Sequence, residues 1–170
     1  IYPSSLREEL DEKIGGYILE EPERYIKKSE VDKYMKSLLN IAQNRFNVAR
    51  YMMGKDDWDL FVVVFECTDR VQHNFWKYMD TVHPEYIQKD NKRYGNLISD
   101  VYKYMDYKIG ELIRSLPENS TFIILSDHGF GPLYKGVRLN KWLEINSCLC
   151  NIRAAKLSRK EVLIKELKRM

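Results

Sequence analysis

The chain has 170 residues, of which 44% are hydrophobic and 12% aromatic, so it can bury a substantial core and is not disordered as a whole. Its 28 basic and 25 acidic residues leave a net charge of +3, a balance that gives no nucleic-acid or membrane-surface footprint. No signal peptide is visible and the apolar runs are far shorter than the ~20 residues that cross a bilayer, so we expect a cytoplasmic protein.

Residues 1–58 are expected to form a helical segment. Ser5 and Glu8 have the spacing of a capping box, and the helix that they begin should stop at Gly15. A longer helix should start near Ser29 and end at Gly54. Its apolar residues recur at intervals of three and four: Val31, Tyr34, Met35, Leu38, Leu39, Ala42, Phe46, Ala49 and Met53.

Residues 59–150 are expected to form an α/β core. The apolar runs 60–66 and 121–126 show no polar alternation, which is typical of strands buried on both faces. Between them, residues 94–116 have one apolar face and end before Pro117, as an amphipathic helix would. A strand, a long crossover and a second strand predict parallel pairing. The predicted fold class is therefore α/β, a parallel sheet flanked by helices.

Two further helices are expected near the end of the sequence. Asn140 could cap a short one that includes Trp142. Residues 151–170 are predicted to form a basic amphipathic helix, since Ser158 and Glu161 again have capping-box spacing. Such a helix is usually solvated, although it could also dock a partner or a further domain of the same protein.

The three cysteines indicate reduced thiols inside a cell, because an odd number cannot form a complete set of disulfides. Cys67 follows a predicted strand, where a packing role is expected. Cys148 and Cys150 are separated by a single residue, and no second pair occurs elsewhere. This spacing argues against a structural zinc site or a redox motif.

Two pairs of acidic and histidine residues are the strongest functional signal. Asp69 and His73 follow the first predicted strand, and Asp127 and His128 follow the second. The carboxyl ends of neighbouring parallel strands lie together, so we expect the two pairs to meet. Carboxylate oxygens and imidazole nitrogens are ligands of divalent zinc, manganese or iron. The pattern predicts a two-metal centre for phosphoryl-transfer chemistry.

Each pair by itself has a simpler interpretation, because a single histidine is more often a surface residue and an Asp-His step can merely cap a turn. The conjunction favours metal binding, since the pairs stand at equivalent strand ends and contain two of only three histidines. The third, His83, lies beside Pro84 in a polar loop and is expected to be structural or exposed.

Residues 69–76 and 126–132 together resemble the middle and late metal motifs of the type I phosphodiesterase/nucleotide pyrophosphatase family, within the alkaline phosphatase superfamily. Residues 137–143 are also similar to archaeal and bacterial members, and the resemblance extends over roughly residues 59–149. It implies an alkaline-phosphatase-like fold and two metal ions, zinc first and manganese as the alternative. Asp69 and His73 would bind one ion, and Asp127 and His128 the other.

The resemblance also implies groups that cannot be placed in this sequence: an early aspartate, a threonine or serine nucleophile and a late histidine. No histidine follows His128, and the serines near the N-terminus lack a strand-then-turn context. Thr68 is expected to hydrogen-bond at the strand end. We therefore expect a middle-to-late fragment with half of a two-metal site, inactive or nearly so alone, with the nucleophile in the missing remainder of the catalytic domain.

The implied substrate is a phosphodiester or a nucleotide pyrophosphate, which Phe75, Trp76 or Tyr134 could stack against. A nucleic-acid duplex and a membrane are not expected as partners. A phosphomonoesterase or a phosphoglycerate-mutase-like enzyme would use similar ligands, so both remain as alternatives. A non-catalytic binding or interaction domain that keeps these residues is a third possibility.

Overall fold

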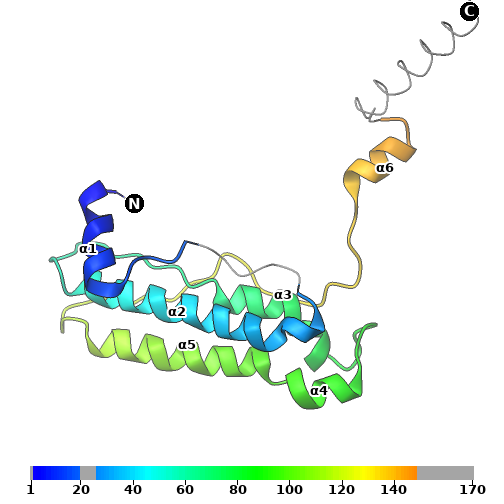
Figure 1. Ribbon diagram of the computed structural model, residues 1–170, viewed down its shortest axis with the longest axis horizontal. Coiled ribbons are helices and arrows are strands. Elements are labelled where there is room, and N and C mark those ends of the chain that lie inside the picture. Colours follow the sequence, from blue (N-terminus) through cyan, green and yellow to red (C-terminus); the bar gives the residue numbers. More distant parts are fainter. Residues whose placement is uncertain (1, 20–25, 149–170) are drawn as a thin grey trace, which may run out of the picture. The chain divides into compact units, whose positions relative to one another are not determined.

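The computed structural model describes residues 2–19 and 26–148 (Figure 1). The chain divides into two compact units, Ile1–Pro132 and Leu133–Met170. The first contains helices α1 to α5 and both predicted metal-binding pairs. The described part of the second contains one short helix, α6 (Leu139–Ile145), in the region where one was expected. It begins after Arg138, so Asn140 lies inside the helix and does not cap it. The amphipathic helix predicted for 151–170 lies outside the described residues.

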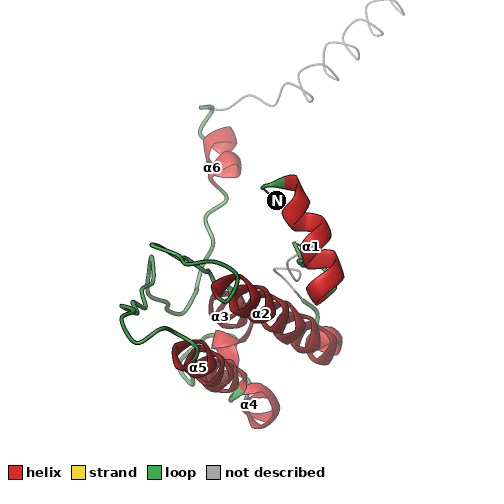
Figure 2. Cartoon of the chain, turned by 90° about the vertical axis from the view of Figure 1, so that its left-hand side faces the viewer, coloured by secondary structure: helices red, strands yellow, loops and turns green. Residues whose placement is uncertain are grey.

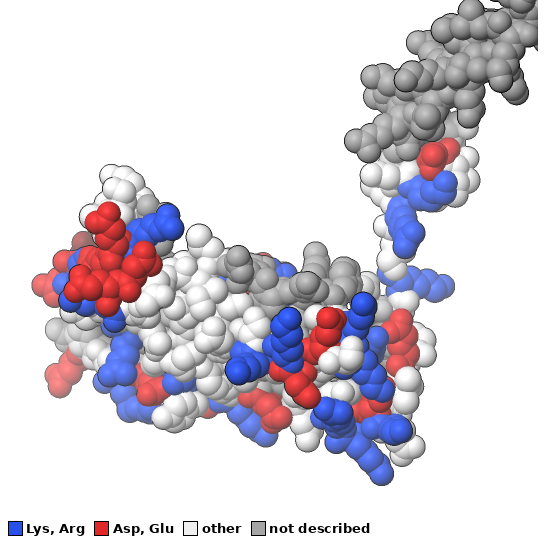
Figure 3. All heavy atoms as spheres, in the orientation of Figure 1, with Lys and Arg blue, Asp and Glu red and all other residues white. Residues whose placement is uncertain are grey.

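Helix α1 (Ser4–Ile14) ends where the sequence predicts, because Gly15 adopts a φ of 78° that other residues rarely take. It is tied to α2 (Val31–Met53) by side chains. The Asn44 amide accepts the Ile18 backbone N–H at 2.9 Å and donates to the Gly16 carbonyl at 2.8 Å. Tyr51 and Lys55 both donate to the Glu9 carboxylate. Figure 3 shows the acidic side chains gathered on α1, which carries Glu8, Glu9, Asp11 and Glu12.

Helices α2, α3 (Cys67–Met79) and α5 (Leu97–Arg114) pack on one another and lie side by side in Figures 1 and 2. Helix α4 (Gln88–Tyr94) also packs on α3, so α3 contacts three other helices. The core is formed by buried residues of these helices: Val31, Tyr34, Leu38, Ala42, Cys67, Val71, Phe75, Tyr78, Tyr94, Ile98, Val101 and Met105. Burial raises the pKa of the Cys67 thiol to about 11, which keeps it neutral and supports its predicted packing role.

The prediction of a parallel sheet is wrong for the described residues, which contain helices and no strand (Figure 2). Residues 60–66 and 121–126 form no backbone ladder, and most of their apolar side chains are exposed, with Leu60 at 78% and Leu125 at 83%. Apolar residues favour burial, but a strand also needs a neighbouring backbone with which to exchange hydrogen bonds. Neither run has such a neighbour among the described residues.

The helix predicted for 94–116 is present as α5, but a separate helix precedes it. Residues 88–94 form α4, and Gly95 and Asn96 separate it from α5. The Asp90 side chain is buried and accepts a hydrogen bond from Lys28, which holds this short helix close to the start of α2. None of the described helices is both long and apolar enough to cross a membrane.

We expect Phe75→Ala to destabilise the first unit, Ile1–Pro132, which we call the helical unit, by about 3–5 kcal/mol. This is the usual cost of removing a buried aromatic side chain. Phe75 is 1% exposed and its ring lies 5.9 Å from that of Tyr34 and 5.8 Å from that of Tyr78, measured between centroids. Tyr107→Ala on α5 is the control, since Tyr107 is 61% exposed. Equal urea midpoints for the two variants would show that Phe75 does not stabilise the core.

Candidate metal centre

The first Asp/His pair lies on one face of α3. Asp69 occupies the first turn and His73 follows one turn later, which places their side chains together. Asp69 Oδ1 lies 3.3 Å from His73 Nε2, and the two side chains are 32% and 28% exposed. The position of Asp69 near the helix N-terminus also favours its negative charge. The helix thus holds one oxygen and one nitrogen ligand in a fixed relation that remains accessible to solvent.

The spacing of this pair suits a tetrahedral metal ion. Two ligands at about 2.0–2.1 Å from zinc and at tetrahedral angles are separated by about 3.3–3.4 Å. The observed 3.3 Å between Asp69 Oδ1 and His73 Nε2 matches this separation. The donor chemistry also fits, because zinc and manganese accept both carboxylate oxygen and imidazole nitrogen. The separation and the donor types of the first pair therefore fit such an ion.

The second pair lies in the segment that follows residues 121–126. Asp127 Oδ2 is 3.8 Å from His128 Nε2, and the side chains are 88% and 57% exposed. His128 Nδ1 lies 2.7 Å from the Gly129 carbonyl oxygen, to which a protonated Nδ1 donates. In the neutral ring this leaves the lone pair on Nε2, the atom that faces Asp127 and could bind a metal. The Ser126 hydroxyl donates to the His128 carbonyl at 2.7 Å and closes the turn.

Phe130 connects the segment of the second pair with the helix of the first. Its ring meets His73 edge-on, with 4.8 Å between centroids and an 80° angle, and stacks on Trp76 at 5.6 Å and 28°. The pKa of His128 is raised, first by its hydrogen bond to the Gly129 carbonyl and then by the carboxylate of Asp127, with a further contribution from Asp69. The carboxylate of Asp69 on α3 therefore acts electrostatically on His128 of the second pair.

The two pairs do not merge into one ligand set. Within residues 2–19 and 26–148, no group of three or more histidine, cysteine, aspartate or glutamate side chains is placed to share a metal ion. Each pair offers two ligands, so an ion bound there would complete its coordination with water or with other groups. The structure brings together the predicted partners within each pair, and Phe130, two residues after His128, contacts His73 of the first pair.

Other residues named from the sequence lie elsewhere. His83 is buried, and its Nδ1 accepts the Glu85 backbone N–H at 3.1 Å, so its role is structural. Phe75 belongs to the core and cannot stack on a substrate, whereas half-buried Trp76 lies at the site. Tyr134 belongs to the second unit. The packing of Phe130 was missed, because the sequence shows an aromatic residue after the Asp-His step but not the helix it contacts.

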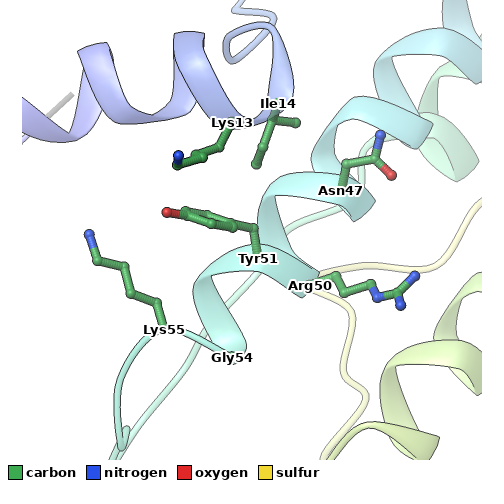
Figure 4. Close-up of a pocket in the computed structure, with 7 residues that line it drawn as sticks. All are labelled: Lys13, Ile14, Asn47, Arg50, Tyr51, Gly54 and Lys55. Carbon is green, nitrogen blue, oxygen red and sulfur yellow. The ribbon is translucent and has the colours of Figure 1, made fainter.

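A hollow in the first unit lies away from this site. It has a volume of about 690 Å³, lies between α1 and the end of α2, and is lined by Lys13, Ile14, Asn47, Arg50, Tyr51, Gly54 and Lys55. In Figure 4 the Lys13 and Tyr51 side chains extend toward the same side while Arg50 points away. Lys55 and Tyr51 already bind Glu9, so the basic groups do not converge on an empty anion site.

The family model described as type I phosphodiesterase / nucleotide pyrophosphatase matches residues 4–167, nearly the whole chain. No curated protein and no solved structure gives a significant match.

We expect Asp127→Asn and Asp69→Asn each to lower the pKa of His128. Both carboxylates favour the imidazolium, so removing either charge makes the proton easier to lose. A metal ion competes with that proton, so its affinity for this pair should rise as pH increases through the pKa. The pKa is measured by NMR titration of the His128 ring proton. Asp106→Asn, an exposed carboxylate on α5, is the control, and an unchanged pKa in Asp69→Asn would mean that the pairs lie apart.

Proposed function

The chain belongs to the type I phosphodiesterase / nucleotide pyrophosphatase family, a hydrolase family, and we propose that it carries part of a two-metal phosphoesterase centre. In this proposal Asp69 and His73 bind one divalent ion, while Asp127 and His128 bind the other. Zinc is our first choice and manganese the alternative. The substrates are phosphodiesters or nucleotide pyrophosphates, and we place the reaction in the cytoplasm.

The observation that carries this proposal is the geometry of the first pair. A separation of 3.3 Å between Asp69 Oδ1 and His73 Nε2 suits two ligands of one tetrahedral ion. An ordinary surface Asp/His pair could show this distance too. The second pair, held beside the first through Phe130, is what favours a metal centre over a simple ion pair on a helix.

In this proposal the residues of the chain bind the metal ions and orient the ligand side chains. Bound divalent ions supply Lewis acidity toward a phosphoryl oxygen and lower the pKa of an attacking hydroxyl. The Gly129 carbonyl holds Nδ1 of His128 protonated and directs Nε2 toward Asp127. Beside the carboxylate of Asp69 lies a cluster of three contacting rings, those of His73, Phe130 and Trp76. Neither Thr68 nor Ser126 is assigned as the nucleophile, which we expect outside this chain.

Two other functions use the same residues. A phosphomonoesterase or mutase on this scaffold would bind the same ions but prefer a terminal phosphate. A non-catalytic interaction domain would keep the two pairs as surface ion pairs, which the 88% exposure of the Asp127 side chain permits.

The chain should bind zinc or manganese, and Asp69→Asn, His73→Ala, Asp127→Asn and His128→Ala should each weaken this binding. We expect a loss of more than about tenfold, because even losing a hydrogen bond to a metal ligand commonly costs ~10–100-fold. Isothermal titration with zinc on the metal-free chain measures the affinity. The matched control is Asp106→Asn, an exposed acid far from both pairs in sequence. Equal zinc content in His73→Ala/His128→Ala and the wild type would favour the interaction domain.

With zinc or manganese present, hydrolysis of bis-p-nitrophenyl phosphate should exceed that of p-nitrophenyl phosphate. The turnover of this chain alone should be low, since each pair supplies only two ligands. Both activities are followed by nitrophenol release at a chain concentration high enough to detect slow reactions, with the Asp69→Asn/Asp127→Asn variant as the blank. A clear preference for the monoester would support the phosphomonoesterase alternative.

A further inference from the structure

Phe130 is the one residue of its stretch that is shielded from solvent. All other residues of 121–131 are exposed, whereas Phe130 is half-buried. Among the described residues, no hydrogen bond joins 121–131 to any helix, since those of Ser126 and His128 stay within the turn. The turn is shaped by its own hydrogen bonds, and the ring contacts of Phe130 join it to α3.

The ring of Phe130 packs on two aromatic side chains of α3, His73 and Trp76, which we call its seat. It contacts His73 edge-on at 4.8 Å and stacks on Trp76 at 5.6 Å, measured between centroids. The Trp76 indole is itself oriented, because its Nε1 donates to Asp80 Oδ2 at 3.2 Å near the end of α3. Edge-to-face and offset-stacked rings attract each other beyond the burial of their surface. Trp76 is thus oriented by a hydrogen bond in which Phe130 takes no part.

This seat restricts where the second pair can lie. Phe130 is two residues from His128 and three from Asp127, and consecutive Cα atoms are about 3.8 Å apart. The Asp127 Cα can lie no more than about 11 Å from the Phe130 Cα. The contact of Phe130 with His73 therefore keeps the second pair within a short length of chain of α3. Glycine residues flank Phe130 on both sides and offer no side chain that could replace its contact.

We propose that Phe130 is a positioning residue that couples the two Asp/His pairs. By inserting between His73 and Trp76, it seats the 126–131 turn on α3 and orients the His73 ring beside Asp69. It binds no metal and touches no reacting atom. The expected effect on metal binding rests on the proposed function. The contact of Phe130 with His73 and Trp76 does not, because it is present in the metal-free chain.

The test compares Phe130→Ala with Phe122→Ala in the full 170-residue chain. Phe122 is a phenylalanine of the same stretch, 42% exposed and without a ring contact among the described residues, so it is a matched control. Nuclear Overhauser contacts between the 126–131 turn and α3 are measured on the metal-free protein, together with the ring-proton shifts of His73. Phe130→Ala should abolish these contacts and move the His73 resonances, while Phe122→Ala should do neither.

Zinc titration then measures the consequence. Phe130→Ala should raise the zinc concentration needed to fill both pairs by about tenfold, the size expected from losing aromatic contacts. Phe130→Tyr and Phe130→Trp keep an aromatic ring and should restore both the contacts and the affinity. Phe130→Leu keeps apolar bulk without a ring, so rescue by leucine would show simple burial and overturn the positioning role.

The two proposals fail in different ways. If the wild-type chain binds no zinc, the proposed function fails. The Overhauser contacts of metal-free Phe130→Ala then still show whether Phe130 holds the 126–131 turn on α3. Unchanged contacts and His73 shifts in Phe130→Ala overturn the inference, whatever the zinc affinity. The circular dichroism of each variant is recorded, and Phe130→Leu, which also lacks the ring, replaces the alanine variant if that variant does not fold.

Discussion

The packing of α3 is the constraint on which the rest of the helical unit depends. Its buried face carries Val71 and Phe75, which are 0% and 1% exposed and pack against α2 and α5. Asp69 and His73 follow the same helical spacing but lie on the other side of the helix, while Trp76 is partly buried against the edge of the core. Because the core fixes the rotation of α3 about its axis, it also fixes the direction in which Asp69 and His73 face.

A rigid pair on a helix and an exposed pair on a turn have different physical origins. The first pair owes its spacing to helical geometry, so it would persist wherever α3 is folded. The second owes its local shape to the bonds of Ser126 and His128 with backbone carbonyls, and its location to Phe130. A centre that joins them therefore combines a stable half with a half that is held by few contacts.

The sheet that was expected but not found shows that a local apolar pattern does not predict whether a strand has a partner. The apolar residues of 60–66 and 121–126 indicate a tendency to burial, yet a strand requires hydrogen bonds from another backbone. Among the described residues no such partner is present, and the core is formed by helices instead. In contrast, the helices with 3.6-residue periodicity, α2 and α5, were correctly predicted because their hydrogen bonds are internal.

The sequence by itself determined the long helices and their stops at Gly15 and Gly54, since these depend on local chemistry. It also named the candidate metal ligands Asp69, His73, Asp127 and His128, which stay a prediction. The proximity of Asp69 to His73 followed from their spacing once that segment is helical, although the sequence placed it after a strand. Only the tertiary structure decided that Phe75 belongs to the core while Trp76 remains at the site. Likewise, only packing across 54 residues of chain seats Phe130 on Trp76, a contact between segments that no local pattern specifies.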